Sequence, residues 1–367
     1  MNWESDERIV LTLDAGGTNF AFSAIQRGEQ VGEPAVLPAA ANDLETSLGN
    51  IIQGFERLID NSPTRPAAIS FSFPGPADYP RGVIHDTGNL PAYRGAVALG
   101  PMLAEHFGLP VFMNNDGDLF AYGEAMAGLL PKVNRLLAEA GSPKRYQNLF
   151  AVTLGTGFGG GIVRNGELFL GDNSNAGEIW LLRNKIHNDC FVEEGASIRA
   201  VERSYAEAVG LDLADAPTPK TICEIALGQT DGNQAAAQQA FATLGEVVGD
   251  ALANVLTLVD GLAVIGGGLA GAAPLFMPRL IEEMNGTIAR YTGERLPRLA
   301  QRAFNLDDPA QLAVFLRGEA REVKVPRSQR TITFDPLKRI GVGVSELGTN
   351  HAVALGAYAY ALGQLDK

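Results

Sequence analysis

A repeated pattern of strand, glycine turn, strand and glycine turn constrains the fold of this 367-residue chain more than any other feature. The first copy is RIVLTLDAGGTNFAFSAIQRGEQV, from residue 8, and the second is NLFAVTLGTGFGGGIVRNGELFL, from residue 148. Each apolar run has the composition of a β-strand, and the turns that follow are rich in glycine. We therefore expect an α/β protein with two related halves, in which helices cover a sheet that begins with a β-hairpin.

Helical periodicity occupies much of the sequence between the expected strands. Apolar residues recur at helical spacing in two segments, at Leu44, Leu48, Ile51, Phe55 and Leu58, and at Phe241, Leu244, Val248, Leu252 and Val255. The second helix leads directly into GLAVIGGGLAG, residues 261–271, which predicts a further strand and glycine turn. Residues 296–343 contain prolines and mixed charges without a clear period, and we expect an insertion there.

Composition restricts the class of protein. The chain has 29 Lys and Arg against 42 Asp and Glu, a net charge of −13, so nucleic acid and anionic lipid are not expected partners. The longest apolar region, residues 251–276, is interrupted by Asn254, Asp260 and glycines, and the N-terminal residues do not resemble a signal peptide. Cys190 and Cys223 are too few for a disulfide framework. We expect a soluble cytoplasmic protein.

Three glycine-rich turns, at residues 14–19, 155–160 and 265–268, each follow an apolar strand. Residues 155–160 fit the dinucleotide fingerprint, but a strand rather than a helix follows, and no lysine follows a glycine as a Walker loop requires. One such turn alone is usually an ordinary hairpin turn. Three of them at strand ends favour phosphate binding by backbone N–H groups, with the hydroxyls of Thr18 and Thr156 as further donors. Asp14, at the end of the first strand, can hold Mg²⁺ through water.

The segment VFMNNDGDLFAYGEA, residues 111–125, predicts a strand and then a helix that starts near Asp116. A calcium loop is excluded, because Leu119 and Ala125 stand where its glycine and glutamate are required. Two interpretations of Asn115 and Asp116 stay open from the residues alone. They cap the first turn of the helix, which would stabilise it by about 1 kcal/mol, or they have a functional role at the end of the strand.

The motifs LDAGGTNF, SFPGPAD, NNDGDLFAYGE, VTLGTGFGGGIVRNGEL, NAGEI and VIGGGL occur in the order and spacing typical of the ROK family (repressors, open reading frames, kinases). The chain resembles this family over nearly its whole length outside residues 296–343. The resemblance implies an actin-like ATPase fold, with two RNase-H-like lobes around a cleft that closes on ATP and sugar. It implies a small lobe of residues 1–117 plus about 350–367, and a large lobe of residues 118–349.

The resemblance also implies roles for individual residues. Asp116 would be the base that activates the 6-hydroxyl of a hexose toward Mg·ATP, and Asp118 would support it or lie at the surface. The implied nucleotide-binding residues are Asp14, Gly16, Gly17, Thr18, Asn19, Gly155, Thr156, Gly157, Gly266, Gly267 and Gly268. The implied sugar-binding residues are Gly75, Asn89, Asn115, Asp116, Glu178 and Glu193, with Glu194 as the competing alignment for Glu193. Gly75 and Asn89 are equally compatible with ordinary loop positions.

The chain departs from the family pattern in GEIWLLRNKIHNDCFVEEGAS, residues 177–197. Trp180 and Leu181 stand where the family has Gly-His, and Cys190 alone remains of a cysteine-rich motif. His187 and Cys190 cannot supply the four ligands of a structural zinc site. We therefore expect no zinc, and a sugar preference that is broader or shifted.

Three functions fit these observations. The first is an ATP- and Mg²⁺-dependent hexose 6-kinase of the glucokinase type. The second is an N-acetylhexosamine kinase acting on N-acetylglucosamine or N-acetylmannosamine, and the third is a sugar-binding or regulatory protein without turnover. A ROK repressor would need a DNA-binding domain before the first phosphate loop, where Asp14 already lies. A homodimer is compatible with the resemblance, although no residue indicates its interface.

Overall fold

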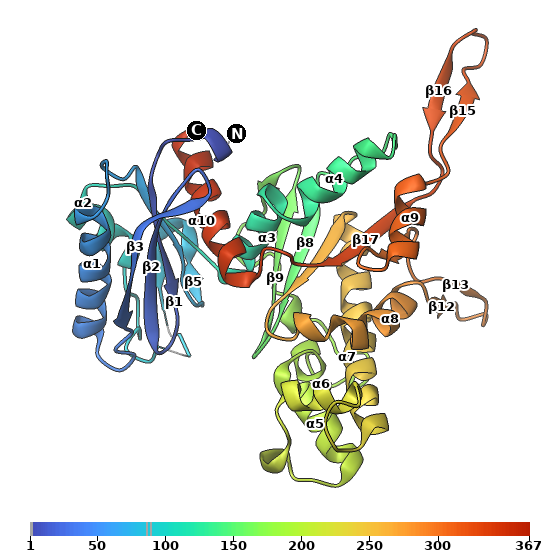
Figure 1. Cartoon of the computed structure of the whole chain (residues 1–367), viewed down its shortest axis with the longest axis horizontal. Coiled ribbons are helices and arrows are strands. Elements are labelled where there is room, and N and C mark those ends of the chain that lie inside the picture. The colour runs from blue at the N-terminus through green and yellow to red at the C-terminus, as the bar shows by residue number, and fades with distance from the viewer. Residues whose placement is uncertain (1–2, 86, 89) are drawn as a thin grey trace. The chain divides into compact units, whose positions relative to one another are not determined.

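The computed structural model describes residues 3–85, 87–88 and 90–367, which fold into two compact units of mixed α/β structure (Figure 1). The first unit comprises Met1–Ala127, Glu167–Ala176 and Leu347–Lys367, and the second comprises Gly128–Gly166 and Gly177–Glu346. The division into a small and a large lobe near residues 117 and 350, which the family resemblance implies, stays a prediction.

The first unit is built on a sheet with the strand order β3-β2-β1-β4-β7. Its strands β1 and β2 are antiparallel, whereas β4 runs parallel to both β1 and β7. The central strands are almost wholly buried because their sequences, VLTLDA and AISFS, are apolar on both faces. The elements of this unit are β1 (Val10–Ala15), β2 (Asn19–Gln26), β3 (Glu29–Pro38), α1 (Leu44–Asp60), β4 (Ala68–Ser72), β5 (Ala77–Asp78), β6 (Val83–Ile84), α2 (Leu99–Phe107), β7 (Val111–Asn114), α3 (Asp116–Met126), β10 (Glu167–Leu168) and α10 (Thr349–Leu365).

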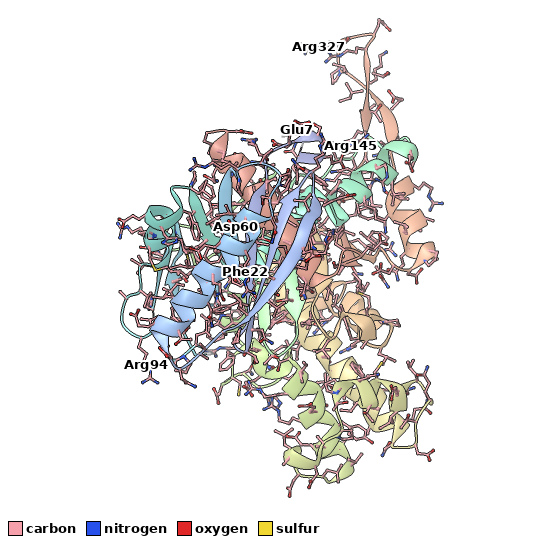
Figure 2. All side chains as sticks on the ribbon, turned by 60° about the vertical axis from the view of Figure 1, so that its left-hand side comes forward. Glu7, Phe22, Asp60, Arg94, Arg145 and Arg327 are labelled. Atoms are coloured by element: carbon pink, nitrogen blue, oxygen red, sulfur yellow. The ribbon has the colours of Figure 1, made fainter. Side chains whose placement is uncertain are left out.

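Helix α1 confirms the amphipathic pattern read from the sequence. It begins after Asp43, whose carboxylate accepts a hydrogen bond from the Thr46 N–H and caps the first turn. Its buried face meets the sheet where Phe55 packs edge-to-face on Phe22 of β2, with ring centroids 5.2 Å apart. The sheet is thereby fixed from one side by an aromatic contact rather than by aliphatic packing alone. Figure 2 labels Phe22, and Asp60 at the end of α1.

Helix α10 returns to the first unit and packs on α3 with unusually close backbones. A Cβ atom on Gly123 would overlap the carbonyl oxygen of Ala352, and one on Gly356 would overlap that of Leu119. Glycine is therefore required on both helices at their crossing. This contact holds the beginning of α3, and with it Asp116, against a long C-terminal helix.

The second unit contains a sheet in which β9, β8, β11, β17 and β14 are neighbours in that order. Strands β8 and β9 are antiparallel, and the other neighbours are parallel. The elements are α4 (Leu129–Glu139), β8 (Leu149–Leu154), β9 (Phe158–Arg164), α5 (Ile198–Val209), α6 (Pro219–Ala226), α7 (Gln234–Val259), β11 (Leu262–Gly266), α8 (Ala273–Met284), β12 (Thr287–Ala289), β13 (Arg295–Pro297), β14 (Arg302–Asn305), α9 (Pro309–Arg317), β15 (Arg321–Lys324), β16 (Thr331–Phe334) and β17 (Arg339–Val344).

The two sheets share one topology, which confirms the two related halves. The order β2-β1-β4-β7 in the first unit matches β9-β8-β11-β17 in the second, with one antiparallel pair followed by parallel pairs in each. Strand β14 and all but the last residue of β17 lie in residues 296–343, which the sequence predicts to be an insertion, so part of that region belongs to the sheet. The sequence signal there is weak because β14 is only four residues long and prolines lie nearby.

Helix α7 is the one candidate membrane span among the residues that the structure describes. By length and composition it could cross a bilayer, and half of its apolar window is buried in the fold. A core helix has the same properties, so the cytoplasmic location stays a prediction.

Candidate functional site

The parallel strands of the first unit bring three sequence motifs to one edge of the sheet. Asp14 at the end of β1 lies opposite Ser72 at the end of β4, and Ser72 lies opposite Asn114 at the end of β7. The segments that follow these strands are the first glycine loop, the Pro-Gly-Pro loop and the Asn115-Asp116 pair. In α/β sheets, ligands bind at the carboxyl ends of parallel strands.

The first glycine loop, Gly16–Asn19, forms the turn of the β1–β2 hairpin. Its ends are closed by a hydrogen bond from the Gly16 N–H to the Asn19 carbonyl at 3.1 Å, and Ala39 N–H donates to the Thr18 carbonyl at 2.9 Å. All four residues of the loop are exposed, as is Asp14 before it. The loop is therefore fixed in shape and open to a ligand.

Asn115 and Asp116 lie where β7 passes into α3. Asn115 is the N-cap, and its side-chain oxygen accepts the Gly117 N–H at 2.7 Å. Asp116 Oδ1 accepts the same N–H at 2.9 Å, and the carboxylate is reached by solvent. The capping interpretation thus holds for Asn115, while the Asp116 carboxylate is positioned by the first turn of the helix and still open to a substrate.

Asp14 and Asp116 both have raised pKa values. Protein atoms packed around the Asp116 carboxyl weaken the hydration of its ionised form and so raise its pKa, although solvent still reaches the group. The hydrogen bond from Gly117 opposes that shift only partly. Loss of solvation, and next the negative charge of Asp116, raise the pKa of Asp14. Two carboxylates near each other at the end of a sheet form a donor set that fits a hydrated Mg²⁺ ion.

Gly75 lies in the loop after β4, and its bond to Pro76 is cis. A Cβ atom on Gly75 would lie 3.1 Å from the Tyr79 hydroxyl, which donates a 2.9 Å hydrogen bond to the Phe73 carbonyl. The loop is therefore tightly packed on its inner side. Asn89, the other sugar-binding candidate near this loop, lies outside the described residues.

In the second unit, the two remaining glycine turns lie side by side at the ends of β8 and β11. Gly266 is opposite Thr153 in the sheet, and a Cβ atom on Gly155 would lie 4.0 Å from the Gly268 nitrogen. Gly267 has φ 89°, and a side chain there would collide with the Leu154 backbone. The structure thus brings the second phosphate loop, Gly155–Gly157, together with the predicted adenosine segment, Gly266–Gly268.

Glu193 lies directly against the second phosphate loop. Its Oε2 atom accepts the Phe158 N–H at 2.9 Å, and a Cβ atom on Gly157 would lie 2.8 Å from the same oxygen. Glu194 instead pairs with Arg203 at 2.7 Å and with Arg199 at 3.5 Å. The hydrogen bond to Arg203 lowers the pKa of Glu194. Glu193 thus lies against the glycine loop, whereas Glu194 pairs with arginines, and the choice between them as sugar ligand stays a prediction.

Glu178 has a partner that the sequence did not reveal, the indole of Trp180. The Trp180 Nε1–H donates to the Glu178 carboxylate, and the indole packs edge-to-face on Phe191 at 5.6 Å. Gly177 packs against Gly160 of β9, and neither glycine has room for a side chain there. This contact fixes the backbone position of the neighbouring Glu178. A short 3-10 turn, Ile179–Leu181, brings Glu178 and Trp180 together, and such turns have no sequence period. Leu181, at the family histidine position, is exposed.

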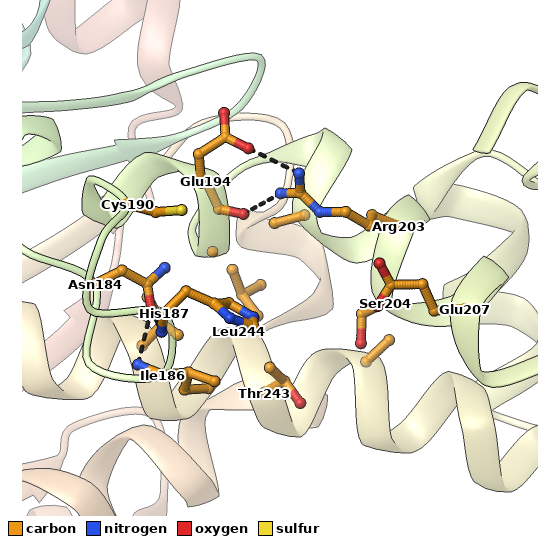
Figure 3. A pocket seen from close by; sticks show the side chains of 14 residues that line it. Asn184, Ile186, His187, Cys190, Glu194, Arg203, Ser204, Glu207, Thr243 and Leu244 are labelled. Atoms are coloured by element: carbon orange, nitrogen blue, oxygen red, sulfur yellow. Dashed lines mark hydrogen bonds and ion pairs between the residues drawn. The ribbon is translucent and has the colours of Figure 1, made fainter.

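His187 and Cys190 line a pocket of about 380 Å³ behind the turn that carries Glu193 and Glu194 (Figure 3). Figure 3 shows Arg203 reaching from α5 to Glu194 across the top of this pocket. Within the described ranges of the chain, no three His, Cys, Asp or Glu side chains are grouped so as to hold a metal ion. The expected lack of zinc stays a prediction.

Comparison with known proteins identifies the family. The ROK family model matches residues 10–316, and the chain belongs to the ROK family. The solved glucokinase from Parabacteroides distasonis ATCC 8503 is 55% identical, with 99% of each chain covered and a TM-score of 0.92. N-acetyl-D-glucosamine kinase of Photobacterium profundum is 29% identical over 76% of this chain and 88% of that protein.

A more distant structure shows how widely the fold is shared. The ROK family glucokinase from Streptomyces griseus, solved in complex with glucose and AMPPNP, is 19% identical and has a TM-score of 0.60, with 95% of this chain and 98% of that chain covered. Together with the closer structure it confirms the predicted fold class, a mixed α/β protein of the actin-like ATPase type.

Proposed function

We propose that this chain, a sugar kinase of the ROK family, transfers the γ-phosphoryl group of ATP to the 6-hydroxyl of a hexose, and that glucose is its preferred sugar. The observation that carries the proposal is the position of Asp116. Its carboxylate is fixed by the Gly117 N–H at the start of α3, is open to solvent, and has a raised pKa. These are the properties of a general base placed for proton abstraction.

The reaction follows from these residues. Asp116 accepts the proton of the 6-hydroxyl as that oxygen forms a bond to the γ-phosphorus, and the bond from this phosphorus to the bridging oxygen breaks to release ADP. The glycine loops at residues 16–19 and 155–157 offer backbone donors to the phosphates. Mg²⁺, when bound near Asp14, would neutralise charge on the phosphates.

Sugar recognition is assigned to carboxylate and amide groups whose orientation the fold fixes. Asn115 uses its oxygen to cap α3, which leaves its NH₂ group to donate to a sugar hydroxyl. Glu178 and Glu193 are each held by one N–H donor, from Trp180 and Phe158, and each keeps further lone pairs for sugar hydroxyls. Gly75 and Asn89 are proposed to complete the sugar site.

The choice of glucose is supported by the glucokinase that is 55% identical across nearly the whole chain. N-acetylglucosamine is the second candidate, because the N-acetyl-D-glucosamine kinase relative is 29% identical over 76% of the chain. The two sugars differ only at the 2-position, so the same base and nucleotide loops serve both reactions.

A coupled ADP-release assay over glucose, mannose, N-acetylglucosamine and N-acetylmannosamine tests the proposal. Wild type should turn over glucose with the highest kcat/KM. Asp116→Asn should lose roughly 10²–10⁴-fold in kcat, the range that general base catalysis supplies. Asp60→Asn, an exposed position at the end of α1, is the matched control and should keep full activity.

Two results would contradict the proposal. Turnover confined to an N-acetylhexosamine would replace glucose by the second candidate. Folded wild type that binds sugar by calorimetry but releases no ADP with any of them would assign a binding role without catalysis.

A further inference from the structure

The pocket of about 380 Å³ in the second unit is lined in large part by two helices. Residues 200–207 of α5 and residues 240–247 of α7 each line it with four side chains at the spacing i, i+3, i+4 and i+7, which is one face of a helix. The loop 184–190 and the end of the turn Val192–Gly195 complete the lining (Figure 3). Neither Glu178 nor Glu193, the proposed sugar ligands of this unit, lines the pocket, so it is a separate space.

A buried amide with an unused donor, that of Asn184, borders this pocket. Asn184 is wholly buried, and its side-chain oxygen accepts the N–H groups of Ile186 and His187 at 2.9 and 3.1 Å. Because a backbone N–H group only donates, these two bonds fix which end of the amide is oxygen. The Nδ2 group has no hydrogen-bond partner among the residues that the structure describes, and Figure 3 shows it on the pocket side of the amide. Since buried donors are rarely left unpaired, this amide indicates a ligand that offers an acceptor.

The surroundings of this amide suit a small molecule better than a single water. A Cβ atom on Gly195 would lie 2.6 Å from the Asn184 Nδ2 atom and 3.1 Å from both methyl carbons of Val247. We use the floor for Ala240, Leu244 and Val247, which are buried and line the pocket from α7. A buried water needs about two to four polar partners, whereas the floor adds none to the one donor of Asn184. A molecule with one acceptor and an apolar face matches this part of the pocket.

The outer part of the pocket is polar. Ser204 and Thr243 are half-buried hydroxyl groups on the two helices, and Glu207 is an exposed carboxylate on α5. Arg203 already pairs with Glu194 at 2.7 Å. With histidine counted as neutral, the lining therefore has one negative charge in excess, that of Glu207, which opposes an anionic ligand. A carboxylate only accepts hydrogen bonds, so the ligand should carry donors as well.

We propose that this pocket binds a small uncharged polyol. One hydroxyl oxygen of the polyol accepts the Asn184 N–H, its C–H groups pack on the floor, and its other hydroxyls bond to Glu207, Ser204 and Thr243. A hydroxyl group both donates and accepts, which is what the two ends of the pocket require. A volume of about 380 Å³ lies within the range of small-molecule sites.

A polyol in the pocket should also strengthen sugar binding, because the two sites share the turn Val192–Gly195. Gly195 borders the Asn184 amide, and Glu193 in the same turn accepts the Phe158 N–H beside the second phosphate loop. A ligand that bridges Asn184 and the two helices would hold this turn, and with it the Glu193 carboxylate. We expect glucose to bind about five-fold more tightly, at the lower end of typical couplings between sites. This coupling rests on the proposed role of Glu193 in sugar binding, whereas occupation of the pocket does not.

Solution NMR of the full chain with isotope-labelled asparagine tests the site directly. Asn184→Asp keeps the oxygen that accepts from Ile186 and His187 but removes the NH₂ group, so the side-chain signals missing from its spectrum belong to Asn184. Glycerol, sorbitol and myo-inositol are the probes. We expect at least one of them to shift the Asn184 NH₂ signals of wild type in a saturable way.

Two variants fill the pocket from different helices. Thr243→Phe places a ring in it from α7, and Ser204→Phe places one from α5, so both should remove the shift. Thr257→Phe is the matched control, because it makes the same change at an exposed position of α7 that does not line the pocket, and it should keep the shift. The circular dichroism of each variant should match wild type.

Several results would overturn the proposal. No shift with any of the three probes would leave the pocket to water, and a shift with sodium phosphate or sodium acetate instead would replace the polyol by an anion. A shift that persists in both filled variants would place the polyol elsewhere. Calorimetry of glucose binding, with and without the polyol that shifts Asn184, measures the coupling, and an unchanged Kd would overturn it. Wild type that shows the NMR shift but releases no ADP would contradict the proposed function alone.

Discussion

Glu193 and Phe158 are joined by a hydrogen bond of 2.9 Å, in which the Phe158 N–H donates to the carboxylate. Phe158 begins β9 immediately after the second phosphate loop, so this bond ties a proposed sugar ligand to a proposed nucleotide loop within one unit. Gly157 must lack a side chain for the carboxylate to approach so closely. A change at Glu193 should therefore affect both substrates, unlike a change at Glu194.

Glu193→Gln is expected to lower kcat/KM for the hexose by about ten- to hundred-fold, because a neutral amide replaces a charge-assisted acceptor worth about 1.5–3 kcal/mol. The KM for ATP should rise as well, through the Phe158 contact. Glu194→Gln is the control: its pair with Arg203 is partly exposed, so it should cost less than about 1 kcal/mol of stability and leave the hexose KM nearly unchanged. Initial-rate kinetics in both substrates separate the two, and a larger effect at Glu194 would favour the competing alignment.

Asp116 gives a prediction for the pH dependence of activity. A base must be ionised to accept a proton, so kcat/KM should fall as the pH drops through its raised pKa, at a higher pH than for an ordinary aspartate. The acidic limb of the pH–rate profile, measured with saturating Mg·ATP, reports this midpoint. An acidic limb at the position of an unperturbed carboxyl would argue against Asp116 as the titrating base.

The raised pKa of Asp14 gives a prediction for the pH dependence of stability. A carboxyl group whose pKa is raised on folding favours its protonated form in the folded state, so its ionised form costs stability above that pKa. Asp14→Asn should therefore raise Tm at pH 7, and the gain should shrink as the pH falls through the raised pKa of the folded state and vanish below the lower pKa that the group has in the unfolded chain. Thermal melts at pH 7 and pH 4 without nucleotide measure the difference. An equal gain at both values would assign the effect to something other than ionisation.

The sequence predicts those parts of the fold that depend on local chemistry. The hairpins at Asp14 and Gly155 are recognisable because glycine turns follow β-rich runs, and α1 because its apolar spacing is regular. The proximity of Asp14 and Asp116 cannot be predicted from local sequence, because it follows from the order β1-β4-β7 in the parallel part of the sheet. The pairing of β14 with β17 cannot be predicted locally either, because the paired residues are distant along the chain.

Trp180→Phe tests the indole that replaces part of the family motif. The change keeps the edge-to-face contact with Phe191 but removes the N–H that orients the Glu178 carboxylate. Losing a hydrogen bond to a charged group costs about 1.5–3 kcal/mol, so the hexose KM should rise by about ten-fold or more with kcat less affected. Trp3→Phe, at the other tryptophan of the chain, should leave the hexose KM unchanged. Equal KM values for both variants would mean that Glu178 does not depend on Trp180.

Gly356→Ala tests the close contact between α10 and α3, on which the position of Asp116 depends. The new methyl group would overlap the Leu119 carbonyl, and overpacking of this kind costs about 1–3 kcal/mol, so Tm should fall. Gly49→Ala is the matched control, because it lies inside α1 with nothing within 4 Å of the added Cβ atom. Replacing an exposed helical glycine by alanine stabilises by about 0.5–1 kcal/mol, so this control should raise Tm. Opposite signs from the same chemical change can come only from the packing around each glycine. Two gains in Tm would therefore mean that α10 does not pack on α3 as closely as the structure has it.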